Sequence, residues 1–144
     1  MSQQLKTPTL IDVRGPRFSA TITVIVLAIA LATQNAWVLA LQAVVFAIGA
    51  IRGPQFTPYA FIFKRVVKPR LRGEVVTEDS RPPQFAQTVG FVFALVGLLG
   101  AAIGSSLVFG IAVGFALAAA FLNSVFNYCL GCEMYLLVLR IRTR

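Results

Sequence analysis

Residues 18–51 read FSATITVIVLAIALATQNAWVLALQAVVFAIGAI, and no charged residue interrupts this run. As one straight helix the run would extend about 50 Å at about 1.5 Å per residue, well beyond the roughly 30 Å hydrocarbon core of a bilayer. The run must therefore turn back on itself, and the polar stretch Thr33-Gln34-Asn35 is the place for the turn. We expect a transmembrane hairpin whose spans cover residues 18–33 and 36–51.

A second apolar run, from Phe85 to Leu130, poses the same length problem. We expect it to break at Gly104-Ser105-Ser106, or one turn later at Gly110. The resulting spans cover residues 85–104 and 107–128.

The composition agrees with this architecture. Of the 144 residues, 58% are hydrophobic and 12% are charged, about half the charged fraction of an ordinary soluble domain. The sequence therefore predicts an all-α integral membrane protein with four transmembrane helices, and residues 1–144 form a single membrane domain. For the short first hairpin, a shallow re-entrant loop or a signal peptide are alternatives. We do not favour a signal peptide, because a similar segment recurs later in the chain, where signal-peptidase cleavage could not explain it.

Charge placement predicts the orientation. All 13 basic residues lie outside the four expected spans: they precede the first span, fill the central loop 52–84 or end the chain. Both hairpin tips are uncharged, so the positive-inside rule places both termini and the central loop in the cytoplasm. We interpret the net charge of +8 as orientation and contact with anionic lipid, and not as nucleic-acid binding.

The chain also shows signs of a duplication. A D-x-R-x-P-x-F-x-x-T pattern begins at Asp12 and recurs from Asp79. We infer two repeats, over about residues 12–67 and 79–140, each with a turn before the helix, a hairpin and an interfacial segment. Because both hairpins start and end inside, the repeats should be related by an axis along the membrane normal.

The two interfacial segments are expected over Tyr59–Val67 and Tyr128–Leu139, mainly apolar stretches with Lys64 and Arg65 in the first and Arg140 directly after the second. Such stretches can lie in the headgroup plane with their basic side chains reaching outward. The only cysteines of the chain, Cys129 and Cys132, fall in the second of these segments as a C-x-x-C motif. Since the first copy has none, one half of a duplicated scaffold carries the candidate site.

Two cysteines at this spacing can form a redox-active pair, in which the first attacks a partner's disulfide and the second resolves it. Cys129 and Cys132 are therefore the candidate catalytic residues, with no cofactor expected. Closing a disulfide in a continuous helix would strain the turn, so we expect a helix break or restart over residues 129–131. Two alternatives stay open: the thiols are inert buried packing groups, or they bind metal together with a second copy or a partner, since the chain has no histidine.

Other residues of the spans have structural interpretations. Asn123 and Asn127 lie one turn apart and are expected to form hydrogen bonds between helices. Glycines of the third and fourth spans are expected at close helix contacts (Gly90, Gly97, Gly100, Gly104, Gly110 and Gly114). No Asp, Glu, Lys, Arg or His lies within the spans, which disfavours an ion-coupled pump or transporter.

Three stretches, Arg14-Gly-Pro-Arg-Phe18, Arg81-Pro-Pro-Gln-Phe85-Ala-Gln87 and Cys129-Leu-Gly-Cys132-Glu-Met-Tyr135, resemble the small bacterial membrane family called domain of unknown function 4395. The resemblance covers nearly the whole chain and implies an actinobacterial-type plasma-membrane protein. Members of that family often occur beside thioredoxin-like and rhodanese-like proteins, which fits thiol or sulfur handling. The family supplies no established activity.

Two functional hypotheses follow. The first is a cytoplasm-facing membrane dithiol that exchanges electrons or sulfur with a thioredoxin-like or rhodanese-like partner. The second is a non-catalytic membrane scaffold or accessory subunit that binds lipid or a partner protein through its basic face. Both leave the substrate, quinone involvement and homo-oligomerisation open.

Overall fold

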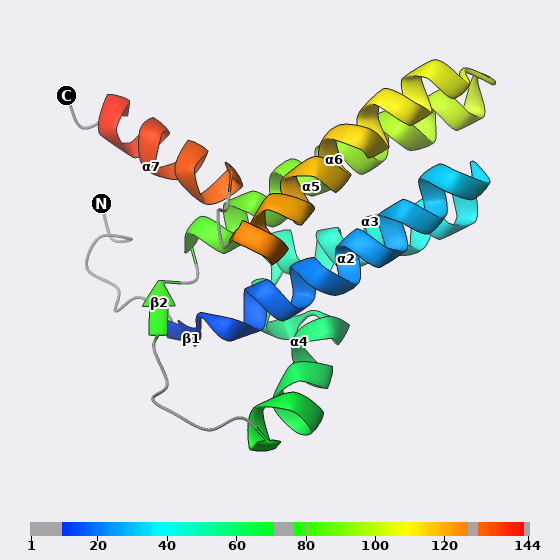
Figure 1. Ribbon diagram of the computed structural model, residues 1–144. Coiled ribbons are helices and arrows are strands. Elements are labelled where there is room, and N and C mark those ends of the chain that lie inside the picture. The colour runs from blue at the N-terminus through cyan, green and yellow to red at the C-terminus, as the bar shows by residue number, and fades with distance from the viewer. Residues whose placement is uncertain (1–9, 71–76, 80, 127–129, 143–144) are drawn as a thin grey trace.

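The computed structural model describes residues 10–70, 77–79, 81–126 and 130–142. A first hairpin is formed by α2 (Arg14–Thr33) and α3 (Ala36–Ile51), and a second by α5 (Arg81–Ala102) and α6 (Ser106–Phe126). Figure 1 shows the turns of both hairpins at one end of the bundle, while the short helix α4 (Pro58–Ile62) and helix α7 (Leu130–Arg142) lie at the other.

The observed helices match the expected spans closely, except where two of them begin. The bounds of α3 are those predicted, whereas α2 and α5 start four residues early, at Arg14 and Arg81. Prolines cause this difference: Pro16 and Pro83 lie in the first helical turn, where a residue needs no backbone donor. The segments that the sequence suggested as turns before the helices are therefore the first turns of the helices themselves.

Both hairpin turns form at the predicted polar stretches. Gln34 ends α2 in the left-handed conformation with φ of 52°, and the Asn35 side chain caps α3 by accepting a hydrogen bond from the backbone of Trp37 at 2.9 Å. In the second turn Gly104 has φ of 77°, a conformation that favours glycine. The alternative break at Gly110 is wrong, because this residue lies inside α6.

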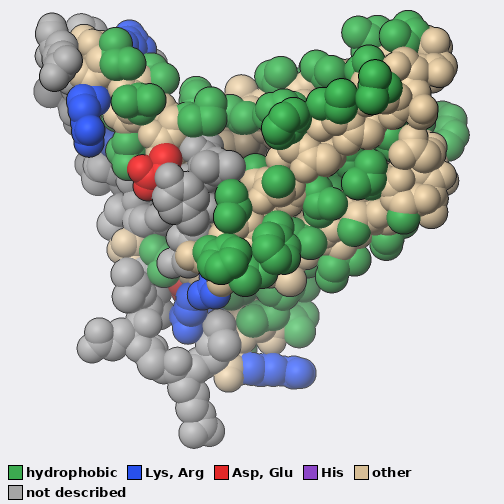
Figure 2. Space-filling model, turned by 45° about the horizontal axis from the view of Figure 1, so that its top comes forward, with side chains coloured by type: hydrophobic (Ala, Val, Ile, Leu, Met, Phe, Trp, Pro, Cys, Tyr) green, Lys and Arg blue, Asp and Glu red, His purple; other side chains and the backbone are tan. Residues whose placement is uncertain are grey.

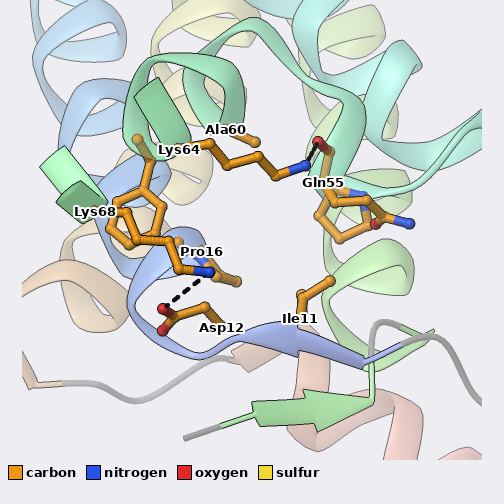
Figure 3. A pocket seen from close by; sticks show the side chains of 10 residues that line it. Ile11, Asp12, Pro16, Gln55, Ala60, Lys64 and Lys68 are labelled. Carbon is orange, nitrogen blue, oxygen red and sulfur yellow. Dashed lines mark hydrogen bonds and ion pairs between the residues drawn. The ribbon is translucent and has the colours of Figure 1, made fainter. Parts of the chain in front are cut away.

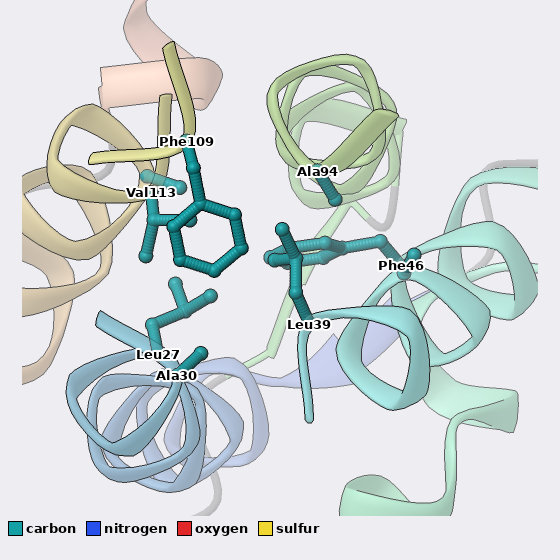
Figure 4. Packing of buried hydrophobic residues seen from close by; sticks show 9 residues of the cluster. Leu27, Ala30, Leu39, Phe46, Ala94, Phe109 and Val113 are labelled. Atoms are coloured by element: carbon teal, nitrogen blue, oxygen red, sulfur yellow. The ribbon is translucent and has the colours of Figure 1, made fainter. Parts of the chain in front are cut away.

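The four long helices pack as a ring in the order α2, α3, α5, α6, with α2 against α6 and α3 against α5. Figure 4 shows side chains from all four converging on one core. Leu27 of α2, Leu39 of α3 and Phe109 of α6 are almost completely buried there. The two hairpins therefore pack largely against each other.

Glycines of α5 allow this close approach. A Cβ at Gly90 or Gly97 would lie 2.8 Å from the side chain of Phe46 or Leu39, and one at Gly100 would lie 2.8 Å from the backbone nitrogen of Phe109. The same prediction is wrong for the fourth span, where a Cβ at Gly110 or Gly114 would meet nothing within 4 Å. In that span the small residues that pack in the core are alanines instead.

A short ribbon, which the all-α prediction did not include, joins the beginnings of the two halves. Strand β1 (Leu10–Asp12) pairs antiparallel with β2 (Thr77–Asp79), and Ile11 faces Glu78. At the offset of 67 residues that relates Asp12 to Asp79, Ile11 and Glu78 are equivalent positions. Two strands related by a two-fold axis pair in this way; the duplication and the superposition of the two halves stay predictions.

The outer surface of the bundle is apolar. Helices α2, α5 and α6 are long and apolar enough to cross a membrane, whereas α3, with 16 residues, extends only about 24 Å at about 1.5 Å per residue. Large side chains such as Leu41, Leu99 and Phe115 are about 60% exposed. Figure 2 shows apolar side chains along the helices and the visible Lys and Arg side chains away from the hairpin turns. The structure is therefore compatible with a membrane protein.

After α3 the chain forms a series of short turns: a 3-10 turn (Pro54–Phe56), α4, a π-helical turn (Phe63–Val67) and a second 3-10 turn (Lys68–Arg70). The buried hydroxyl of Thr57 caps α4 by accepting from the backbone of Ala60 at 3.3 Å. Phe63 is buried against the ring of Phe18, with 5.8 Å between their centroids. This contact holds the first expected interfacial segment against α2.

Candidate functional site

Cys132 lies in the first turn of α7. Helix α6 ends at Phe126 and α7 begins at Leu130, so a separate helix starts within the region where a break or restart was predicted. Cys129, Tyr128 and Asn127 lie outside the described residues. The geometry of the predicted C-x-x-C pair therefore stays a prediction, and the site is built below from Cys132.

Helix α7 is held to the bundle mainly by α5. The ring of Tyr135 lies 5.7 Å from that of Phe85, at an interplanar angle of 55°. One turn earlier on α7, Cys132 is half-buried, and it is a disulfide-bonded cysteine in this structure.

A cavity of about 260 Å³ extends from Cys132 into the bundle. Cys132 and Met134 of α7 form one wall, and side chains of α2, α3, α5 and α6 form the others. Most of the lining is apolar, including Phe46, Phe93 and Phe115. A cavity of this kind can admit an apolar group beside the sulfur of Cys132.

Three polar side chains interrupt the apolar lining: Thr23, Gln87 and Asn123. The Oε1 atom of Gln87 is buried and has no hydrogen-bond partner among the described residues. An unpaired buried acceptor is costly, and this atom packs against α3, where a Cβ at Gly49 would lie 2.8 Å from it.

Asn123 was expected to form hydrogen bonds between helices, but the structure places it on the cavity wall. The bonds between α2 and α6 at this level come from its neighbour instead. The hydroxyl groups of Ser124 and Thr21 share a hydrogen bond of 2.7 Å, and Nε of Arg17 donates to the carbonyl of Ser124 at 2.9 Å. These contacts fix α6 on α2 beside the cavity.

A buried chain of hydrogen bonds that sequence reasoning missed leads to the same cavity. The Tyr59 hydroxyl donates to Oε1 of Gln42 at 2.7 Å, and Nε2 of Gln42 lies 3.5 Å from the hydroxyl of Thr23. Burial raises the pKa of Tyr59. The sequence signal for these hydrogen bonds was Gln42 itself, an amide inside an apolar run.

No metal site is complete within the described part of the chain. Those residues contain no group of three or more His, Cys, Asp or Glu side chains that could hold an ion. Metal binding by Cys129 and Cys132 together with a partner or a second copy stays a prediction.

Comparisons with known proteins give one match. The sequence model of a family described as "Domain of unknown function (DUF4395)" matches residues 11–140. No curated protein and no solved structure matches the chain.

Proposed function

This chain belongs to the DUF4395 family, whose description assigns no activity, and from the site we propose that it is a membrane dithiol protein that faces the cytoplasm. In this proposal it exchanges electrons or sulfur with a soluble thioredoxin-like or rhodanese-like partner. Its four helices cross a bacterial plasma membrane, and both termini and the loop between the hairpins face the cytoplasm.

The observation that carries the proposal is the environment of Cys132. A half-buried, disulfide-bonded cysteine lies at the start of a separate helix, at the end of the bundle where the visible basic side chains gather. A cysteine used only for packing would need neither a helix start nor a cavity beside it. Partial burial suits the resolving thiol, which must react with a neighbouring sulfur but not with bulk solutes.

The proposed exchange balances as follows. The Cys129 thiolate attacks one sulfur of the partner's disulfide, forms a mixed disulfide and releases the partner's other sulfur as a thiolate, which takes up a proton. The Cys132 thiolate then attacks Cys129 and releases the second sulfur of the partner. The net result is a reduced partner and an oxidised Cys129–Cys132 pair, with two electrons transferred.

A trapping experiment tests these roles. Cys132→Ser removes the resolving thiol and should accumulate a mixed disulfide between Cys129 and a cytoplasmic protein, visible as a reductant-sensitive band on a non-reducing gel. Cys129→Ser should trap much less, and the double variant provides the baseline. Equal trapping by both single variants would refute the assigned roles, and stronger trapping by Cys129→Ser would reverse them.

A redox titration in membranes separates this proposal from the scaffold alternative. Exchange with cytosolic partners requires a midpoint potential between roughly −220 and −320 mV. The scaffold alternative is favoured by the exposed apolar side chains of α7, which include Met134, Leu137 and Ile141. If no disulfide forms at any potential of the titration, and the thermal stability does not change across it, the scaffold is the better explanation.

A further inference from the structure

A second cavity, of about 190 Å³, lies between the start of α2 and the turns that follow α3. The N-terminal side contributes Asp12 and Gly15, and the other side contributes Gln55, Lys64 and Lys68. Figure 3 shows Lys64 reaching across the cavity toward Gln55, while Lys68 reaches Asp12. None of these residues belongs to the cysteine site.

The carboxylate of this cavity is already neutralised. The side chain of Asp12 is only 6% exposed and accepts hydrogen bonds from Nε of Arg14 at 3.1 Å, from its terminal nitrogen at 2.8 Å and from its backbone at 3.0 Å. These bonds from Arg14 hold the pKa of Asp12 below its usual value. With Arg14 as the main partner of Asp12, the charge of the lysines is largely uncompensated.

The two lysines have weak partners. Nζ of Lys68 lies 3.9 Å from the Asp12 carboxylate, at the limit of an ion pair. Nζ of Lys64 donates to the neutral carbonyl of Gln55 at 3.1 Å, and no carboxylate of the described residues lies within ion-pair distance of it. An ammonium group has three donors, so both lysines retain capacity for an anion.

The surroundings of the cavity point to a lipid as the source of that anion. Phe61, Ile62 and Val66 lie in the same segment as Lys64, and each is between 46% and 50% exposed. Nζ of Lys64 also lies 5.7 Å above the ring of Phe61. Exposed aromatic and aliphatic side chains beside basic ones are typical of a segment in the membrane interface, where acyl chains would contact the apolar side chains.

We propose that this cavity is a binding site for the phosphate group of an anionic phospholipid, held by Lys64 and Lys68. In the π-helical turn the backbone N–H of Lys68 bonds to the carbonyl of Phe63, and Phe63, Lys64 and Lys68 all line the cavity. A general attraction of basic residues to a negative leaflet would involve no particular cavity. The proposed site has one cavity, two donor side chains and one headgroup.

The test measures binding of phosphatidylglycerol to the full-length protein in detergent by native mass spectrometry. The variant Lys64→Gln/Lys68→Gln should weaken the first bound lipid about 25-fold, taking about fivefold for the hydrogen bond to phosphate that each lysine loses. The matched control is Arg65→Gln/Arg70→Gln, which removes the same charge from the same segment but from residues that do not line the cavity. The control should stay within about twofold of the wild type.

Each outcome decides the proposal. Selective loss in the lysine variant, with an unchanged melting temperature and weak binding of phosphatidylcholine, supports it. Equal weakening in both double variants would show a general electrostatic attraction, and equal binding of phosphatidylcholine would show no anion selectivity; either overturns the site. Displacement of the lipid by millimolar inorganic phosphate would assign the cavity to a free anion and refute the lipid.

Discussion

Gln42 lies fully buried in a helix that is otherwise apolar, and its amide is satisfied from two sides. Tyr59 of α4 donates to its oxygen, and its nitrogen faces Thr23 of α2. A buried amide without partners would cost several kcal/mol in a membrane environment. These bonds therefore attach the short helix α4 to the interior of the first hairpin.

Tyr59→Phe should destabilise the protein by about 1–3 kcal/mol, because it leaves the buried oxygen of Gln42 without a donor. The measurement is the melting temperature in detergent. Tyr135→Phe, which removes a hydroxyl from the half-buried ring on α7, is the matched control and should change it less. Adding Gln42→Leu to Tyr59→Phe should restore part of the loss, since no unpaired acceptor then remains; a further loss would contradict the assigned bond.

The same hydroxyl gives this stability a pH dependence. Because burial raises the pKa of Tyr59, the folded protein holds the phenol proton more tightly than the unfolded chain does. The contribution of Tyr59 is complete below the unfolded pKa of about 10 and declines as the pH rises above it. The difference in melting temperature between wild type and Tyr59→Phe should therefore shrink as the pH rises above about 10, and a constant difference there would argue against a buried phenol.

Residue-level contacts of this kind were only partly predictable from the sequence. Asp12 pairs with the side chain of Arg14 and also accepts the backbone N–H of Arg14, the first residue of α2. The Tyr59–Gln42 bond was not predicted, because a single amide in an apolar run does not indicate which distant residue lies beside it. For Asn123, the sequence identified a polar position but not that it faces a cavity.

At the scale of the helices, contact between α5 and α6 depends on Gly100. The variant Gly100→Ala places a Cβ 2.8 Å from the backbone nitrogen of Phe109, so the two helices must separate. We expect destabilisation of about 1–3 kcal/mol, typical of overpacking, measured by thermal unfolding. Gly110→Ala is the control: its Cβ meets nothing, and alanine favours the helix by about 0.5–1 kcal/mol. A similar loss in both variants would mean that packing at this contact is not tight.

Hydropathy predicted the long helices and their turns because those depend on local composition, and the bounds of α3 are as expected. The ribbon of β1 and β2 was not predicted, since strands of three residues are too short to show an alternating pattern. The helix restart before Cys132 was predicted from the geometry of a C-x-x-C disulfide. The packing of α7 on α5 was not predicted, because the sequence contains no signal that pairs Tyr135 with Phe85.

For the whole molecule, orientation in the membrane is the main prediction still to be tested. Single cysteines at Gln34 and Ser105, in a background without Cys129 and Cys132, should react with an impermeant maleimide added outside intact cells. These positions lie in the two turns at one end of the bundle. A cysteine at Gly73, outside the described residues, should not react because the loop is expected inside. Reaction of Gly73 alone would invert the orientation.

The pairing of α2 with α6 and of α3 with α5 also constrains how the cell can make this protein. The first hairpin leaves the ribosome before its partners have been synthesised. Leu39 and Phe46, which end up against Gly97 and Gly90, lack these partners until the second hairpin has been made. The β1–β2 ribbon can close only after Asp79 has emerged. Any pause in translation between the two hairpins would lengthen the life of this half-built intermediate and its exposure to membrane proteases.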